Sequence, residues 1–177
     1  MLSPDMSRGI ECFVDADFAG NRRPEDAEDR TSLLSRTGFV IFFWGCPITW
    51  VSKLQTEVAL STTEAEYIAL SHSVRELIPF RNLTLELQIR LDLLPSNTTI
   101  SCKVFEDNNG ALELATKPKF RPRTKHIAIK YHHSRGSVKS GAIEVLPIDT
   151  LEQVADIFTK ALDQQKFEYL RKKLIGW

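Results

Sequence analysis

Paired cysteines, a net charge and a long apolar run are all missing from this chain. Its three cysteines lie far apart in the 177 residues, and no two of them form a CxxC pair. That spacing argues against a zinc site or a disulfide framework and predicts buried free thiols in a reducing compartment. No apolar run approaches the ~20 residues that a membrane span needs. The N-terminus also has no signal-peptide core. We therefore expect a protein that is neither membrane-bound nor secreted.

Charge is balanced overall but unevenly distributed. Lysine and arginine together number 23, as do aspartate and glutamate. No overall field therefore attracts the chain to nucleic acid. The stretch from Lys117 to Lys139, called here the basic stretch, holds eight basic residues and no acidic one. Such a stretch can bind phosphate groups even on a neutral protein, and the alternative is a solvated positive face.

The pattern of apolar residues predicts an α/β protein. The length and the 42% hydrophobic content fit one globular domain over residues 1–177. Alternating runs predict strands at 10–18, 37–44, 48–54, 99–105 and 142–147. Helical spacing predicts helices at 61–91, 107–115, 125–139, 150–162 and 164–174, with Pro79 expected to kink the first or to end its first half. The order βββαβααβαα indicates a mixed sheet flanked by helices. We expect the core over about 10–162 and the last helix at 164–174.

Four acidic residues from distant segments stand out as a candidate site. They are Asp15 in VDADFAG, Glu64 in LSTTEAEYIAL, Asp107 in VFEDNNGA and Asp156 in EQVADIFTKAL. Carboxylates that converge from distant segments can hold two divalent ions for phosphodiester hydrolysis. Such a set predicts a hydrolase, provided that the fold brings the four together.

The two strand-associated acids each have a structural alternative. Asp15 lies within an apolar strand, where a charge is costly unless it is paired or bound to metal. It would otherwise face water from an edge strand, with Asp17 on the same face in a supporting role. Asp107 follows a strand and would otherwise serve as the N-cap of a helix that starts at Asn108.

The two helix-associated acids also have alternatives. Glu64 forms a capping-box pattern with Ser61, although it also lies one turn before the apolar stripe of its helix. We expect Glu66 to point elsewhere and to be solvated. Asp156 would otherwise pair with Lys160 at i+4 on a solvated helix face. Taken singly, each acid is ambiguous.

The stretch SRTGFVIFFWGCPITWVSKLQTEVALSTTEAEYIAL resembles the ribonuclease H domain of copia-type retrotransposons. The motifs VDADFAG, VFEDNNGA and EQVADIFTKAL match the same family in order, and the resemblance spans about residues 10–174. It implies the ribonuclease H-like fold, with a five-stranded mixed sheet. It also implies that Asp15, Glu64, Asp107 and Asp156 bind two Mg²⁺, for which Mn²⁺ substitutes. One departure is the loop 148–150, where many ribonucleases H carry a histidine and this chain has none.

The implied function is cleavage of the RNA strand of RNA–DNA hybrids during reverse transcription. The implied partners are the hybrid and an adjacent reverse transcriptase of the same polyprotein, with the isolated domain a monomer. The implied location is a retrotransposon particle in the cytoplasm, or the nucleus. Candidate substrate contacts are Ser61, Thr62, Asn108, Asn109, Lys117, Lys119, Arg121, Arg123, Lys125 and Lys130. Two alternatives stay open, a non-catalytic binding module that supports the polymerase and a nuclease of the same fold that acts on DNA.

Overall fold

Five strands form one mixed sheet in the computed structural model, which describes residues 3–20, 22, 25, 29–92, 100–117 and 132–177. The strands are β1 (Ile10–Asp17), β2 (Arg36–Phe43), β3 (Cys46–Leu54), β4 (Cys102–Glu106) and β5 (Glu144–Pro147). Their order across the sheet is β3-β2-β1-β4-β5. The β1–β2 and β2–β3 pairs are antiparallel, whereas β4 runs parallel to both β1 and β5. The predicted mixed α/β sheet is therefore confirmed.

A two-residue turn joins β2 to β3. Trp44 and Gly45 both have a positive φ, at 52° and 77°. Two such residues in succession suit the tight turn that matches the twist of a hairpin. The predicted strands at 37–44 and 48–54 left residues 45–47 between them, but Cys46 already pairs with Phe43.

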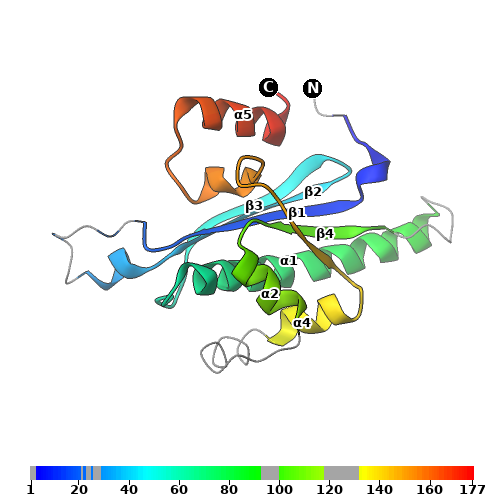
Figure 1. Ribbon diagram of the computed structural model, residues 1–177. Coiled ribbons are helices and arrows are strands. Elements are labelled where there is room, and N and C mark those ends of the chain that lie inside the picture. The colour runs from blue at the N-terminus through cyan, green and yellow to red at the C-terminus, as the bar shows by residue number, and fades with distance from the viewer. Residues whose placement is uncertain (1–2, 21, 23–24, 26–28, 93–99, 118–131) are drawn as a thin grey trace.

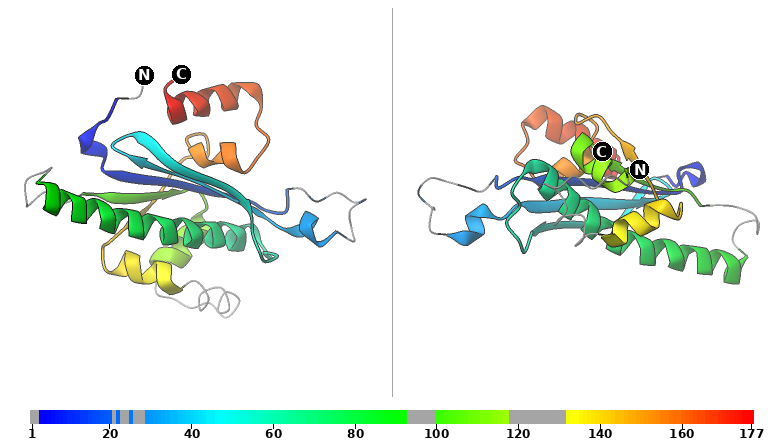
Figure 2. Two further views of the ribbon diagram at one scale, coloured as in Figure 1. Left: turned by 180° about the vertical axis from the view of Figure 1, so that it is seen from behind. Right: turned by 60° about the horizontal axis from the view of Figure 1, so that its bottom comes forward.

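Helices cover both faces of the sheet (Figure 1, Figure 2). On one face lie α1 (Thr62–Leu91), α2 (Asn109–Thr116) and α4 (His132–Lys139). On the other lie the 3-10 helix η5 (Val154–Phe158) and the last helix, α5 (Gln164–Ile175). Two further 3-10 turns, η1 (Met6–Arg8) and η3 (Arg30–Leu33), flank β1 and β2 in the sequence. Successive residues of β1 serve opposite faces, since Val14 belongs to the α1-side core and Phe13 to the η5-side core.

The first long helix does not end at Pro79. It runs through the proline as a single helix of 30 residues. The proline removes one helical hydrogen bond, which usually breaks a helix. Here burial on both sides of the proline outweighs that loss, because Leu77 is fully buried before it and Thr84 is buried after it. The prediction that the first half ends there was wrong, since it weighed the local cost without the packing.

Two predicted helices differ in part. The segment after Gln153 is a 3-10 helix of five residues, and not a long α-helix. The predicted helix began at residue 150, but Leu151 precedes η5 and is 66% exposed. Residues 125–131 of another predicted helix lie outside the described residues, and α4 is its remaining part. Within the described part of the chain, no helix is long and apolar enough to span a membrane.

Candidate metal centre

The parallel pairing of β1 with β4 aligns two of the predicted acids. The pairing runs from Ile10–Cys102 to Phe13–Phe105. Asp15 and Asp107 each lie two residues beyond that last pair, at the carboxyl ends of the strands. Ligands of open α/β sheets bind at this end. The register therefore brings together residues that are 92 positions apart in the sequence.

The third acid of the cluster comes from the first turns of α1. One carboxylate oxygen each from Asp15, Glu66 and Asp107 lie within 4.8 Å of one another. These three residues are called the acid cluster below. Asp15 and Glu66 are buried, and Asp107 is partly buried. Carboxylate oxygens at this spacing suit a hard divalent cation.

Burial and mutual repulsion perturb the acids strongly. Burial raises the pKa of Asp15 to about 6, although Lys160 and Thr159 act in the opposite direction. Burial, with the neighbouring Glu106 and Asp15, raises the pKa of Glu66 to about 11. Crowded carboxylates cannot all ionise without a compensating cation. A divalent ion would provide that compensation.

A further acid, Glu106, lies beside the cluster. It is fully buried, and one of its oxygens accepts a hydrogen bond from the Asn108 backbone N–H at 3.0 Å. Burial raises its pKa well above the ordinary value. Among the residues that the structure describes, Glu66 Oε2 and Glu106 Oε2 are buried without a hydrogen-bond partner. Buried oxygens without a partner are costly, so this arrangement fits a bound cation.

The structure brings Glu66, and not Glu64, to the acid cluster. Glu64 Oε2 accepts a hydrogen bond from the Leu60 backbone N–H at 2.9 Å, and the Glu64 N–H donates to Ser61 Oγ at 3.1 Å. Glu64 therefore caps α1, which was its structural alternative. The expectation that Glu66 is solvated was wrong, since this residue is 4% exposed. Glu66 lies four residues before Leu70, but Glu64 lies three residues before Tyr67, so helical spacing alone did not favour Glu66.

Asp156 is fully buried but lies outside the acid cluster. Its Oδ1 pairs with Lys160 Nζ at 2.7 Å and its Oδ2 with Lys166 Nζ at 2.5 Å. The predicted i+4 pair with Lys160 is therefore present, although its setting is buried and not solvated. Lys160 Nζ also contacts Asp15 Oδ1 at 3.0 Å and so links Asp156 to the cluster.

A glycine allows η5 to approach β1 this closely. Gly38 lies opposite Asp15 in the β1–β2 register. A Cβ at Gly38 would lie 2.5 Å from Thr159 Cγ2 and 2.9 Å from Phe158 Cβ, which is closer than real Cβ contacts. The absent side chain leaves room for Thr159, whose hydroxyl donates to Asp15 Oδ2. Gly38 therefore positions the η5 side of the site.

The predicted substrate contacts have local structural roles where they are described. Ser61 is the N-cap of α1, and Asn108 is the N-cap of α2. Thr62 and Asn109 are exposed at the starts of the same two helices. Lys117 pairs with Glu113 at 2.8 Å. The others, Lys119, Arg121, Arg123, Lys125 and Lys130, lie outside the described residues, and the role of the whole set stays a prediction.

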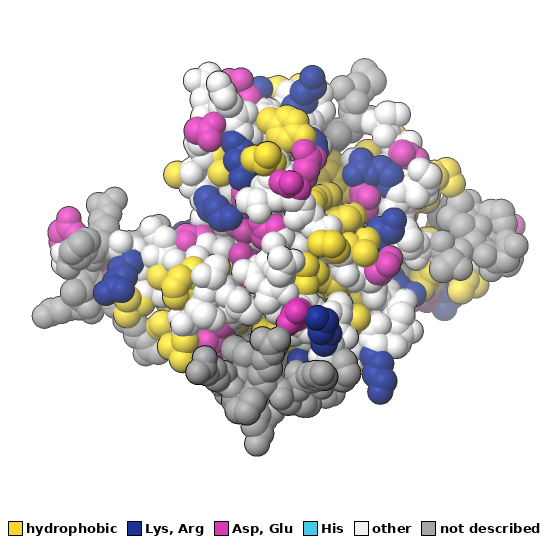
Figure 3. Space-filling model, viewed as in Figure 1, with side chains coloured by type: hydrophobic (Ala, Val, Ile, Leu, Met, Phe, Trp, Pro, Cys, Tyr) yellow, Lys and Arg dark blue, Asp and Glu magenta, His cyan; other side chains and the backbone are white. Residues whose placement is uncertain are grey.

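Acidic and basic side chains gather together on the surface near the site. Figure 3 shows acidic side chains near the middle of this face, with basic side chains beside them. They lie between the C-terminal helices above and α2 below (Figure 1). The middle of this face is therefore of mixed charge.

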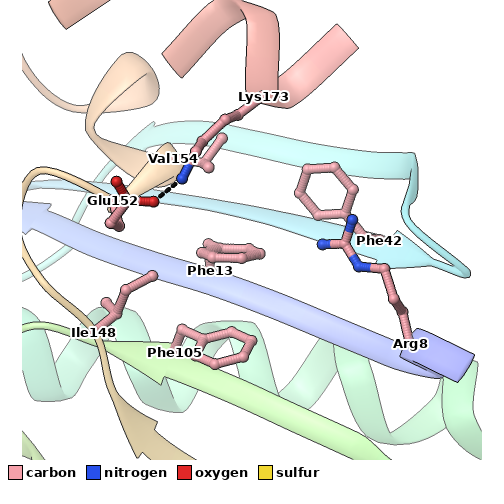
Figure 4. A pocket seen from close by; sticks show the side chains of 8 residues that line it. All are labelled: Arg8, Phe13, Phe42, Phe105, Ile148, Glu152, Val154 and Lys173. Carbon is pink, nitrogen blue, oxygen red and sulfur yellow. Dashed lines mark ion pairs between the residues drawn. The ribbon is translucent and has the colours of Figure 1, made fainter. Parts of the chain in front are cut away.

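A separate cavity of about 340 Å³ lies between the sheet and α5 (Figure 4). We call it the aromatic cavity. Its lining residues are Arg8, Phe13, Phe42, Phe105, Ile148, Glu152, Val154 and Lys173. The rings of Phe13 and Phe105 stack at 4.8 Å between centroids. Lys173 and Glu152 form an ion pair at its edge. None of the lining residues belongs to the acid cluster.

The chain is similar in sequence to retrotransposon polyproteins over most of its length. No protein-family model matches the chain. It is 37% identical over 165 residues to the retrovirus-related Pol polyprotein from transposon RE1 of Arabidopsis thaliana. It is 38% identical over 167 residues to that from transposon TNT 1-94 of Nicotiana tabacum. These matches cover 93% and 94% of the chain. The chain spans about a tenth of the length of these relatives, at 10% and 11%.

Solved structures support the fold. The structure of LC11-RNase H1 in complex with an RNA/DNA hybrid matches with a TM-score of 0.52 and 17% identity. That match covers 85% of this chain and 93% of the other. A second LC11-RNase H1 structure gives a TM-score of 0.53 at 20% identity, over 86% and 93%. The fold is therefore ribonuclease H-like, as the sequence resemblance implied.

Proposed function

Because this chain belongs to the copia-type retrotransposon Pol polyproteins and has a ribonuclease H-like fold, we propose that it is their ribonuclease H domain. It would hydrolyse the RNA strand of RNA–DNA hybrids in a metal-dependent reaction during reverse transcription. We propose that residues 1–177 act as one domain, beside a reverse transcriptase in the same polyprotein. The proposed location is a retrotransposon particle in the cytoplasm or the nucleus.

One observation carries this proposal. Three carboxylates from β1, α1 and the residue after β4 converge within 4.8 Å. One of these carboxylates belongs to Glu66, and its Oε2 is buried without a hydrogen-bond partner in the described part of the chain. A domain that only binds nucleic acid gains nothing from acids that repel one another. The cluster therefore favours hydrolysis over a binding-only role.

The residues present fit Mg²⁺ or Mn²⁺, which prefer carboxylate oxygen. Asp15, Glu66 and Asp107 would hold the first ion, and Asp15 with Asp156 would hold a second. When bound, the ions would activate an attacking water and stabilise the leaving 3′-oxygen. The protein's part is to hold these carboxylates in place. Thr150 donates to Asp107 Oδ2 at 2.8 Å and Thr159 to Asp15 Oδ2, so each has a supporting hydroxyl.

The proposed substrate is a duplex with one RNA strand. The 2′-hydroxyl distinguishes RNA from DNA and lies in the minor groove. The solved relative LC11-RNase H1 was crystallised with an RNA/DNA hybrid, which supports this choice. The basic stretch would contact the phosphates, and its binding should weaken as the salt concentration rises.

Cleavage of a labelled RNA–DNA hybrid with Mg²⁺ or Mn²⁺ tests the proposal. Single-stranded RNA and duplex DNA are run beside it, together with Asp15→Asn and Asp107→Asn proteins. We expect cleavage of the hybrid alone, lost in both variants. Cleavage of duplex DNA would identify a DNA nuclease of the same fold. Salt-dependent hybrid binding without cleavage, even with the reverse transcriptase attached, would identify a binding module and overturn the proposal.

A further inference from the structure

A lysine already lies between two of the proposed metal ligands. The Lys160 Nζ is 3.0 Å from Asp15 Oδ1 and 2.7 Å from Asp156 Oδ1. Both carboxylates are fully buried, whereas the lysine side chain is 37% exposed. The ammonium group therefore lies where a cation shared by these two carboxylates would bind.

The remaining oxygens of the same two carboxylates are also in use. Asp15 Oδ2 accepts from the Thr159 hydroxyl, and Asp156 Oδ2 pairs with Lys166 at 2.5 Å. Among the described residues, Asp156 is not part of the group of acids that lie within 4.8 Å of one another. Within the described residues, the acid cluster therefore keeps one buried oxygen without a hydrogen-bond partner, Glu66 Oε2, whereas Lys160 and Lys166 occupy both oxygens of Asp156.

The backbone fixes this arrangement. The Lys160 N–H donates to the Asp156 carbonyl at 3.0 Å, and the Thr159 N–H donates to the same oxygen at 3.2 Å. Thr159 and Lys160 therefore follow η5 in a tight turn that directs both side chains to Asp15. The lysine stem is flexible and its side chain is 37% exposed, so the ammonium can move into solvent without unfolding the turn.

We propose that Lys160 occupies the second cation position, so that a second divalent ion binds between Asp15 and Asp156 only when the ammonium leaves. This inference rests on the proposed function and adds an order to it. The acid cluster takes an ion first, at a position that Lys160 does not occupy. Two cations at one site repel each other strongly in a buried setting, so Lys160 and the second ion exclude each other. Lys160 therefore competes with the second ion and raises the Mg²⁺ concentration at which that ion binds.

Calorimetric titration with Mg²⁺ alone, without nucleic acid, tests this inference. The Lys160→Met variant keeps the length of the stem and removes its charge. We expect wild-type protein to bind one ion well before the second. In Lys160→Met the second ion should bind at least about tenfold more tightly, which is about 1.4 kcal/mol. Lys160→Gln is a second variant, since its amide can still donate to a buried carboxylate if the methionine protein does not fold.

Lys166→Met is the matched control. It removes the same charge from the same carboxylate, Asp156, but does not open the position that Lys160 fills. We expect no comparable gain in affinity for the second ion. An equal gain in Lys166→Met would show a general charge effect and overturn the inference. Unchanged binding of both ions in the Lys160 variants would overturn it as well.

The wild-type protein offers an independent measurement. In protein labelled with ¹³C-lysine, the Cε resonance of Lys160 is assigned by comparison with Lys160→Arg. It should move towards that of an exposed lysine as Mg²⁺ exceeds saturation of the first position. A resonance that stays unmoved up to roughly 100 times the first dissociation constant would contradict the displacement.

The two proposals fail in different ways. If wild-type protein binds no ion, both are wrong. If it binds one ion and the Lys160 variants behave like wild type, only the inference on Lys160 is wrong. If ion binding follows the expected pattern but no hybrid is cleaved, even with the reverse transcriptase attached, the proposed function is wrong and the order of ion binding stands.

Discussion

The aromatic cavity and the acid cluster are built from the same two strands with opposite results. Phe13 and Phe105 form the last pair between β1 and β4, and their rings stack at 4.8 Å. Two residues further along, Asp15 and Asp107 bring carboxylates together instead. In the first region neighbouring side chains complete one another's contacts. In the second they raise one another's pKa and leave buried oxygens without a partner. One region therefore stabilises the fold, and the other costs stability until a cation binds.

Replacing one glutamate of α1 should break the acid cluster and leave the cavity intact. We expect Glu66→Gln to abolish hybrid cleavage, a larger loss than the roughly 10–100-fold cost of an outer-shell partner. Glu64→Gln keeps an amide oxygen that can accept the Leu60 N–H, so it should change cleavage by less than about threefold, with at most ~1 kcal/mol of stability lost. Steady-state cleavage rates and calorimetric Mg²⁺ binding measure both effects. Full activity in Glu66→Gln with loss in Glu64→Gln would reverse the assignment made from the structure.

Removing an aromatic ring from the lining of the aromatic cavity should lower stability and leave the acid cluster intact. Phe13 is 9% exposed and packs against both Phe42 and Phe105. Phe13→Ala should lower the free energy of unfolding by about 3–5 kcal/mol. Urea denaturation measures the loss, and Trp50→Ala at a 60% exposed position is the control. The folded protein should still bind Mg²⁺ with nearly wild-type affinity. A lost Mg²⁺ site in folded Phe13→Ala would show that the two regions are not separable.

In the absence of metal, the stability cost of the acid cluster should depend on pH, whereas the phenylalanine rings of the aromatic cavity carry no titratable group. The pKa of Glu66 is raised from 4.5 to about 11 in the folded state. Between these values the folded protein holds a proton that the unfolded chain releases. Stability should therefore be greatest at low pH and fall as the pH rises, by at most about 1.4 kcal/mol per pH unit for this group. Asp15 adds to the fall between its ordinary value of 3.8 and about 6.

Urea denaturation in EDTA from pH 5 to pH 8 measures this effect. Glu66→Gln cannot ionise at this position and should flatten the profile. Mg²⁺ binds the ionised carboxylates and should stabilise the wild type more at pH 8 than at pH 5. A wild-type profile in EDTA that matches Glu66→Gln would show that Glu66 does not carry the effect.

The smallest effect is expected at the edge of the aromatic cavity. Lys173 pairs with Glu152 there, and their side chains are 36% and 40% exposed. Exposed pairs contribute little, because water and salt screen them. We expect Lys173→Met to cost less than about 1 kcal/mol and to leave Mg²⁺ binding unchanged. A loss as large as that of Phe13→Ala would show that the rim pair, and not the aromatic packing, holds α5 to the sheet.

The strands were predictable because their apolar alternation is strong. All five were expected within a few residues of where they lie, and the order of the elements followed. Asp15 and Asp107 were expected at strand positions, and the β1–β4 register explains why they meet. A register between strands that are far apart in sequence cannot be read from either strand alone. The resemblance to a known family supplied that step.

Glu64 was predicted as a metal ligand in place of Glu66 because the same turn of α1 fits both a capping box and the spacing of an apolar face. Glu64 fits a capping box, and it also precedes the apolar residue Tyr67 by three positions. Glu66 precedes Leu70 by four and Leu77 by eleven, which is equally good helical spacing. Residues 65–71 are all buried, so periodicity does not separate one face from another there. Only the packing of α1 against the sheet distinguishes the two glutamates.

Residues in and around η5 complete the site, and they are synthesised long after Asp15. Gln153 donates to the Val14 carbonyl, and Thr159 and Lys160 contact Asp15, across sequence separations of 139 to 145 residues. Contacts of such separation form late, since closing a long loop costs entropy before any contact repays it. During synthesis, the ion pair between Asp15 and Lys160 cannot form until Lys160 has left the ribosome. Until then η5 does not cover the face of β1 that carries Asp15, so a chain that stops before residue 160 would lack both the complete site and the lysine that pairs with Asp15.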